Sequence, residues 1–140
     1  QAVEDADYAF IHDGARPFVD NEMIERAYSA VKEHKACVVG MPVKDTINIV
    51  DDEALVAHTP ERKYVWQVQT PQCFAFPIIY DAYAQMFRDE ESGKTIPPVT
   101  DDAMVLRYKG NYPIQMVEAD YRNIKITTPE DLQIAGLFLS

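Results

Sequence analysis

Apolar and polar positions repeat with different periods at the beginning of the chain, and these periods predict a strand, a helix and a second strand. Residues 8–11 form a short apolar run that stops at an Asp-Gly turn signal, so they predict a buried strand leading into a loop. A helix follows from Asp20 or Asn21 as its cap, and residues 36–41 are strand-like again. The apolar stripe of the helix consists of Ile24, Ala27, Tyr28 and Val31. This order is that of a βαβ unit with parallel strands and a right-handed crossover.

The pattern then changes to two alternating runs that predict an extended β-arm over residues 43–69. Residues 46–50 alternate, and residues 51–53 form a polar turn. One face of the second run is made of Tyr64, Trp66 and Val68. A protruding two-stranded arm cannot bury such a face by itself. We therefore expect the arm to pack on its own domain or on a second subunit.

The second half of the chain predicts three helices and two strands. Residues 79–86 have helical spacing, Thr100 caps a short helix, and Thr128 caps a last helix with proline at its first position. The last helix presents Leu132, Ala135, Gly136 and Leu139 on one face. The alternating runs are residues 114–118 and 124–127. Because there is neither an internal repeat nor a linker, we predict a single α/β domain.

Composition narrows the possible partners. The chain has 140 residues, 47% of them hydrophobic, which suffices for one buried core. Its net charge of -10 disfavours a nucleic-acid polymer or an anionic membrane as partner. A small anionic ligand still fits if the few cations gather at one place and a divalent metal offsets the acids. Because the sequence has no membrane-spanning run and no secretion signal, we expect a soluble protein. We expect Cys37 and Cys73 to be buried free thiols, which favours a reducing cytoplasm.

The first candidate chemistry follows the first predicted strand. Asp13 sits beside Gly14, where a metal ion or ligand can approach the backbone, and Arg16 follows with donors suited to phosphate. The alternative is that Asp-Gly only makes a turn and that Arg16 stacks on Phe18. His12 has no partner at a useful motif spacing, so we interpret it as a packing residue.

Further candidates lie at the ends of other predicted strands. Arg62 and Lys63 precede the return strand of the arm, and both are alternatively solvated surface charges. Thr70 offers a hydroxyl donor, although Thr-Pro also ends strands in general. Thr100 places a hydroxyl beside free backbone N–H groups, or it serves as a cap alone. Lys125 puts a charge in an apolar strand, or it faces solvent by simple alternation.

Together, five segments resemble the family of 2-C-methyl-D-erythritol 4-phosphate cytidylyltransferases in order and spacing. They are His12-Asp13-Gly14-Ala15-Arg16-Pro17-Phe18-Val19, Pro42-Val43-Lys44-Asp45-Thr46, Gln69-Thr70-Pro71-Gln72-Cys73-Phe74, Thr100-Asp101-Asp102-Ala103 and Asn123-Ile124-Lys125-Ile126-Thr127. The resemblance implies a Rossmann-like nucleotidyltransferase fold with a mixed, mostly parallel sheet. It also implies Mg²⁺-dependent transfer of CMP from CTP to the sugar-alcohol phosphate, in non-mevalonate isoprenoid biosynthesis, by a homodimer with interlocked β-arms.

The resemblance further implies a role for each matching residue. Asp13 would bind the metal and the CTP phosphates. The implied catalytic residues are Asp13, Lys125 and Arg62. The implied substrate-binding residues are Arg16, Thr46, Thr70 and Thr100. Of these, Thr46 and Arg62 would reach the methylerythritol phosphate bound by the partner subunit. Such roles suit phosphoryl transfer, which depends on positioning and charge neutralisation and needs no covalent protein intermediate.

One departure from the family concerns the beginning of the chain. Family members open with a strand and a Gly-rich loop whose Arg and Lys hold the CTP triphosphate, and the five glycines of this sequence form no such loop. We therefore expect residues 1–140 to be the C-terminal portion of a single cytidylyltransferase domain, truncated at its N-terminus. Alone, this portion is expected to be unable to turn over CTP and to expose a sheet edge.

Two other functions remain open at this point. Ribitol-5-phosphate cytidylyltransferase shares several of these motifs, although Gly14-Ala15 leans toward the isoprenoid enzyme. A non-catalytic dimerisation or binding module of the same fold is the alternative from another class. The retention of Asp13, Thr46 and Lys125 favours an enzyme over such a module.

Overall fold

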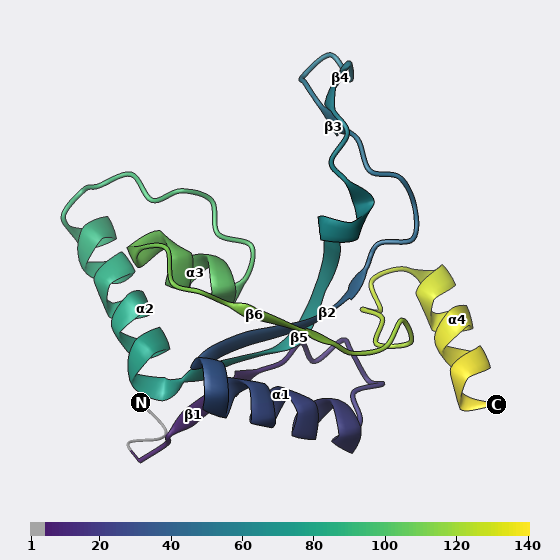
Figure 1. The fold of residues 1–140 in the computed structure, drawn as a ribbon, viewed down its shortest axis with the longest axis horizontal. Helices are drawn as coiled ribbons and strands as arrows, with labels where there is room; N and C mark the ends of the chain where they lie inside the picture. Colours follow the sequence, from purple (N-terminus) through teal and green to yellow (C-terminus); the bar gives the residue numbers. More distant parts are fainter. Residues whose placement is uncertain (1–4) are drawn as a thin grey trace.

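The computed structural model describes residues 5–140 as a sheet with helices on both faces and a hairpin that projects from it (Figure 1). The strands are β1 (Tyr8–Ile11), β2 (Ala36–Pro42), β3 (Ile49–Val50), β4 (Val56–His58), β5 (Trp66–Ala75) and β6 (Gln115–Glu118). The helices are α1 (Asn21–His34), the short 3₁₀ helix η1 (Arg62–Tyr64), α2 (Phe76–Glu91), α3 (Asp102–Lys109) and α4 (Pro129–Leu139). This arrangement confirms the predicted α/β class.

The main sheet has the strand order β1-β5-β2-β6. Strand β5 is antiparallel to both β1 and β2, whereas β2 and β6 are parallel. Three strands therefore point the same way and β5 alone runs against them, so the sheet is mixed as predicted. The strands of the expected βαβ unit, β1 and β2, are parallel in direction, but β5 lies between them.

A bulge between β2 and β5 lies where the polar site is built. The register shifts between Val38, which pairs with Gln72, and Gly40, which pairs with Val68. The shift accommodates Pro71, which has no N–H for a ladder bond, inside a central strand. The Thr-Pro pair therefore does not end the strand. Gly40 is required here because a Cβ at this position would lie 2.4 Å from the Gln67 carbonyl oxygen.

Alternate residues of β2 fill two separate cores. Ala36 and Val38 face the core beneath α2 and α3, together with Phe74 of β5. Cys37 and Val39 face the core beneath α1. Because both faces are covered, β2 reads as a continuous apolar run rather than an alternating one. Cys37 and Cys73 are buried free thiols, as expected.

The arm region holds a short hairpin, β3–β4, that stands away from the sheet (Figure 1). Its turn is tied by Asp51, whose Oδ1 accepts hydrogen bonds from the backbone N–H groups of Glu53 and Leu55. The return segment differs from the prediction, because Tyr64 lies in η1 and not in the strand that contains Trp66. An alternating pattern does not distinguish a strand from a single 3₁₀ turn followed by one.

The helix caps follow the prediction more closely than the helix faces do. The side chain of Asp20 accepts from Met23 N–H at the start of α1, and Thr128 forms a capping box with Asp131 at the start of α4. The buried face of α1, however, is Met23, Ala27 and Val31. Of the predicted stripe, Ile24 and Tyr28 are exposed in α1, as are Leu132 and Leu139 in α4.

Among residues 5–140, none of the helices combines the length and the apolar composition that a membrane span requires.

Candidate active site

A polar pocket of about 260 Å³ lies beside the bulge, between the loop after β1, strand β5 and the start of α3. Its lining residues are Asp13, Arg16, Val68, Gln69, Thr70, Gln72, Thr100, Asp101, Asp102 and Lys125. The pocket therefore brings together five of the seven residues implied as catalytic or substrate-binding. These five are Asp13, Arg16, Thr70, Thr100 and Lys125.

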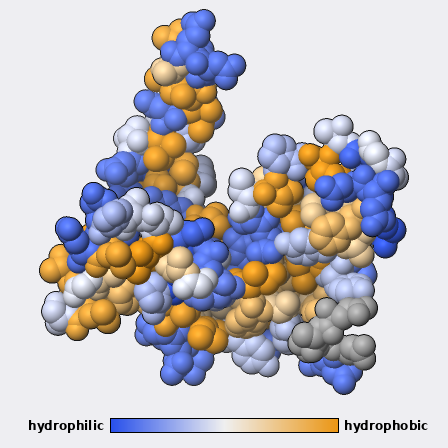
Figure 2. Space-filling view, turned by 180° about the vertical axis from the view of Figure 1, so that it is seen from behind, coloured by the Kyte–Doolittle hydropathy of each residue, from blue (hydrophilic) through white to orange (hydrophobic). Residues whose placement is uncertain are grey.

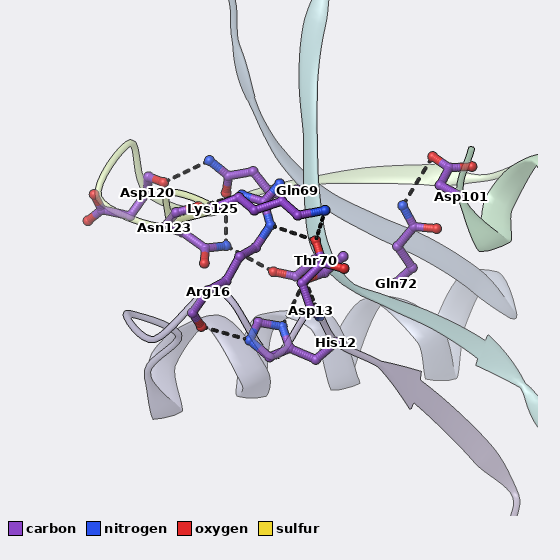
Figure 3. A network of polar contacts seen from close by, with 10 residues as sticks. All are labelled: His12, Asp13, Arg16, Gln69, Thr70, Gln72, Asp101, Asp120, Asn123 and Lys125. Carbon is purple, nitrogen blue, oxygen red and sulfur yellow. Dashed lines mark hydrogen bonds and ion pairs between the residues drawn. The ribbon is translucent and has the colours of Figure 1, made fainter. Parts of the chain in front are cut away.

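The carboxylate of Asp13 joins the two cations of the pocket (Figure 3). Its Oδ2 lies 3.2 Å from Arg16 Nε and 3.6 Å from Lys125 Nζ. The Arg16 side chain is 13% exposed, while that of Lys125 is 49% exposed. Arg16 is thus a fixed part of the wall, and Lys125 has the freedom to reach a ligand.

A buried asparagine holds the Lys125 segment against this wall. Asn123 is completely buried, and its Nδ2 donates to Gln69 Oε1 at 3.0 Å and to the Thr70 carbonyl at 2.9 Å. In return, its own carbonyl accepts from Arg16 Nη1 at 2.7 Å. Buried polar groups with several partners fix backbone position. Lys125, two residues further on, is placed by these bonds.

The segment around Lys125 is irregular, so the predicted strand at 124–127 is wrong. Its backbone bond to the site is Ile126 N–H to the Ala15 carbonyl, at 2.8 Å. The side chains nevertheless alternate, with Ile124 and Ile126 half-buried and Lys125 exposed. Alternation reports which side faces the protein, and it does not require a neighbouring strand.

The start of α3 also differs from the prediction. Asp101, not Thr100, is the N-cap, and its Oδ1 accepts from Met104 N–H at 2.9 Å. The Thr100 hydroxyl lies 3.1 Å from Met104 Sδ instead. Asp and Thr are both good N-caps, and the sequence alone does not decide between neighbours. The exposed Thr100 remains at the pocket without a capping role.

Gln72 connects β5 to the beginning of α3 (Figure 3). Its side chain is 1% exposed, donates from Nε2 to Asp101 Oδ2 at 3.2 Å and accepts from Ala103 N–H at 2.9 Å. From the other side, the Tyr83 hydroxyl donates to Asp102. Burial, together with the neighbouring Asp102, raises the pKa of Tyr83, so the phenol stays protonated and remains a donor.

The structure does not bring Thr46 and Arg62 into this pocket. Thr46 is exposed near the base of the arm, and Arg62 donates from Nη1 to the Lys44 carbonyl at 2.9 Å. Arg62 lines a separate open pocket at the base of the arm, with Pro42, Val43, Glu61 and Lys63. Their implied contact with a ligand of a partner subunit stays a prediction.

The donor set of the pocket fits an ion shared with phosphate. No group of three His, Cys, Asp or Glu side chains suited to a metal is found among residues 5–140. Mg²⁺, however, is commonly held by one or two carboxylates and completed by substrate phosphates and water. Asp13, which lines the pocket, satisfies that requirement. A group brought into the pocket also meets Arg16 and Lys125, two cations suited to phosphate.

Sequence reasoning missed four supporting residues: His12, Gln69, Gln72 and Asn123. His12 is not a packing residue, because it is exposed and both of its ring nitrogens have hydrogen-bond partners. For Gln69, Gln72 and Asn123, the sequence feature that could have indicated a role is a polar side chain within an otherwise apolar or strand-like run. Buried polar side chains usually have hydrogen-bond partners. Gln69, Gln72 and the Nδ2 atom of Asn123 have them, whereas Oδ1 of Asn123 has none within residues 5–140.

Comparison with known proteins finds similarity to a single family along the whole chain. All of residues 1–140 match the family model described as 2-C-methyl-D-erythritol 4-phosphate cytidylyltransferase. The chain is 44% identical over 139 residues to the protein of that name from Lachnospira eligens, covering 99% of the chain and 60% of the relative. It is 47% identical over 137 residues to the one from Clostridioides difficile, covering 98% and 54%. The chain thus spans little more than half the length of these relatives.

Solved structures confirm the predicted fold. The 4-diphosphocytidyl-2C-methyl-D-erythritol synthase of Anaerococcus prevotii superposes with a TM-score of 0.87 at 34% identity, covering 99% of this chain and 61% of that one. The 2-C-methyl-D-erythritol 4-phosphate cytidylyltransferase of Thermus thermophilus superposes with a TM-score of 0.77 at 31% identity, covering 95% and 62%.

Proposed function

The chain belongs to the 2-C-methyl-D-erythritol 4-phosphate cytidylyltransferase family, and from this premise we propose the reaction. The protein transfers a cytidylyl group from CTP to 2-C-methyl-D-erythritol 4-phosphate and releases pyrophosphate. A phosphate oxygen of the sugar alcohol attacks the α-phosphorus of CTP, and the bond to the β-phosphate oxygen breaks. The observation that supports this proposal is the convergence of Arg16 and Lys125 on Asp13 in one pocket.

The reaction brings two polyanions together, so charge is the main obstacle that the site must overcome. Arg16, held by Asp13 and the Asn123 carbonyl, supplies a fixed positive charge with further N–H donors. Lys125 supplies a mobile charge whose ammonium can leave Asp13 for a phosphate oxygen. Thr100 adds an exposed hydroxyl on the α3 side of the pocket.

We further propose that Mg²⁺ takes part and that Asp13 is the residue of this chain that would hold it. When bound, the ion would neutralise phosphate charge and orient the leaving group. Asp13 would then release the Lys125 ammonium to the substrate, because the bound ion would take the place of the ammonium beside the carboxylate. An ion held by one carboxylate would be completed by water and nucleotide phosphates, so it would arrive with the nucleotide.

A homodimer through the arm is the proposed assembly. The hairpin exposes four apolar residues on a projection that buries little of its own surface: Ile49, Val50, Leu55 and Val56. Figure 2 shows hydrophobic surface along this projection. Arg62 and Thr46, at the base of the same arm, would meet the partner's substrate. The buried free thiols support a reducing compartment, for which we propose the cytoplasm.

The test uses a chimaera in which this chain replaces the matching segment of the Lachnospira eligens protein. This design supplies the part of the relative that has no counterpart in the chain. With CTP, Mg²⁺ and 2-C-methyl-D-erythritol 4-phosphate, we expect pyrophosphate release, and less of it with ribitol 5-phosphate. The unmodified relative and the 140-residue chain alone serve as controls, and the chain alone is expected to be inactive. A folded chimaera that releases no pyrophosphate, beside an active relative, would refute the proposal.

A further inference from the structure

His12 is an exposed residue whose ring joins both ends of the Asp13 turn to strand β5 (Figure 3). Its Nε2 lies 2.9 Å from the Arg16 carbonyl oxygen, and its Nδ1 lies 2.9 Å from Thr70 Oγ1. The same Oγ1 accepts the backbone N–H of Asp13 at 3.0 Å. Two short contacts thus connect the first loop of the site to the bulged strand, and the third closes the loop on itself.

When the His12 ring is neutral, the chemistry of its partners assigns the protons in this chain of bonds. The Arg16 carbonyl only accepts, so Nε2 of His12 carries a hydrogen and donates it. In the neutral ring, Nδ1 then has only a lone pair, so the Thr70 hydroxyl must donate to it. The remaining lone pairs of the Thr70 oxygen face the Asp13 amide, which donates to one of them.

This assignment changes the role of Thr70. Its hydroxyl hydrogen is directed at the imidazole of His12, so it does not point at a ligand in the pocket. The Thr70 oxygen instead fixes the backbone of Asp13, whose carboxylate pairs with Arg16 and Lys125. Thr70 is itself 8% exposed, so its side chain has little room to turn elsewhere.

We propose that His12 is a positioning residue that acts through Thr70. By accepting the Thr70 hydroxyl at Nδ1, the ring keeps the Thr70 oxygen available to the Asp13 amide. By donating from Nε2, it holds the carbonyl of Arg16 and closes the turn. This inference rests on the proposed function only for the identity of the phosphate ligands, since the contacts themselves lie within the chain.

Spectroscopy of the ring tests the assignment without any activity. In ¹⁵N-labelled chain at neutral pH, we expect His12 to be the Nε2–H tautomer, with Nδ1 at the resonance position of an unprotonated ring nitrogen. Thr70→Val keeps the shape of threonine and removes the hydroxyl, so it should shift the Nδ1 resonance and leave those of His34 and His58 in place. A Nδ1–H tautomer, or no shift in Thr70→Val, would overturn the proposal.

Two variants separate the two nitrogens of the ring. His12→Asn places an acceptor oxygen near the position of Nδ1, whereas His12→Gln places an amide donor near that of Nε2. We expect hydrogen exchange of the Asp13 amide to stay within about twofold of wild type in His12→Asn and to rise about tenfold in His12→Gln and His12→Phe. His34→Asn, on the far end of α1, is the matched control and should change nothing.

The same variants in the chimaera connect positioning to catalysis. We expect kcat/KM to fall about tenfold in His12→Gln and His12→Phe and to be largely retained in His12→Asn. The proposal would be overturned if the exchange rate of the Asp13 amide and kcat/KM were each the same in His12→Asn, His12→Gln and His12→Phe. If the chimaera itself is inactive, the reaction proposed above fails, and the ring resonances and the Asp13 amide still decide the role of His12.

Discussion

Lys125 Nζ lies 3.6 Å from Oδ2 of Asp13, although the two residues come from opposite ends of the chain. The pair is possible because Asn123, two residues before the lysine, is bonded to Gln69 and to the Thr70 carbonyl. The Thr70 hydroxyl in turn accepts the amide of Asp13. Strand β5 therefore sets the distance between the two loops that contribute the charges.

Replacing Lys125 should separate catalysis from folding. Its side chain is half exposed, so we expect Lys125→Ala to change the free energy of unfolding by less than about 0.5 kcal/mol. In the chimaera, kcat/KM for the sugar phosphate should fall about a hundredfold, because a charge directed at a phosphate is lost. Thermal melting and pyrophosphate release measure the two effects. Lys32→Ala on α1 is the control, and a collapse of the melting temperature in Lys125→Ala would mark the lysine as structural.

Arg16 should not tolerate the conservative change to lysine. Its Nε and Nη1 reach two different acceptors, the Asp13 carboxylate and the Asn123 carbonyl, which a single ammonium cannot match. We expect Arg16→Lys to destabilise the chain by about 1.5–3 kcal/mol, the range of hydrogen bonds to charged groups. Urea unfolding measures this loss. A stability equal to that of wild type would mean that the fork geometry is unimportant.

Gln72 should prove structural for the α3 side of the pocket. Gln72→Leu keeps the volume but removes the partner of the buried Ala103 amide and of Asp101 Oδ2. The expected loss is about 1–3 kcal/mol in the free energy of unfolding. Gln72→Glu retains the acceptor for Ala103 but places a carboxylate against Asp101, so it should also destabilise. An unchanged urea midpoint in both variants would contradict this role.

The arm prediction concerns assembly and not the pocket. Val56 is 57% exposed on β4, and Val56→Asp places a charge on the apolar surface of the hairpin. If the arm forms the dimer, this change should raise the dissociation constant at least about tenfold, as measured by sedimentation equilibrium. Val56→Thr keeps the β-branched shape and serves as control. A monomeric wild-type protein, or an unchanged dimer in Val56→Asp, would refute the assembly.

Much of the fold follows from local patterns, and the exceptions have physical causes. The strand at residues 8–11, the cap of α1 at Asp20 or Asn21 and the cap at Thr128 depend on residues close in sequence. They are confirmed, with Asp20 as the cap of α1, although the strand is half-buried rather than buried. The course of β5 through Pro71 depends on a bulge opposite β2, a long-range feature that no local pattern contains. The 124–127 segment alternates like a strand but is held by side chains instead.

In the site, too, some residues could be predicted from the local sequence, whereas others depend on distant contacts. Asp13 and Arg16 stand out by charge after an apolar run and Lys125 by charge inside one, so their sequence signal is strong. His12 and Asn123 act through hydrogen bonds to distant groups, and their residue types alone do not reveal this. Arg62 and Thr46 lie apart from the pocket in the single chain. Their implied roles depend on a second subunit, which one sequence cannot position.

If the pocket is the active site, the substrates occupy it beside Lys125. Amine acetylation of the chimaera, read by mass spectrometry with and without substrates and Mg²⁺, reports each lysine separately. We expect 2-C-methyl-D-erythritol 4-phosphate with a non-hydrolysable CTP analogue to slow acetylation of Lys125 at least about tenfold, while the exposed Lys32 reacts at an unchanged rate. Equal acetylation of Lys125 with and without substrates, in a chimaera that turns them over, would contradict this expectation.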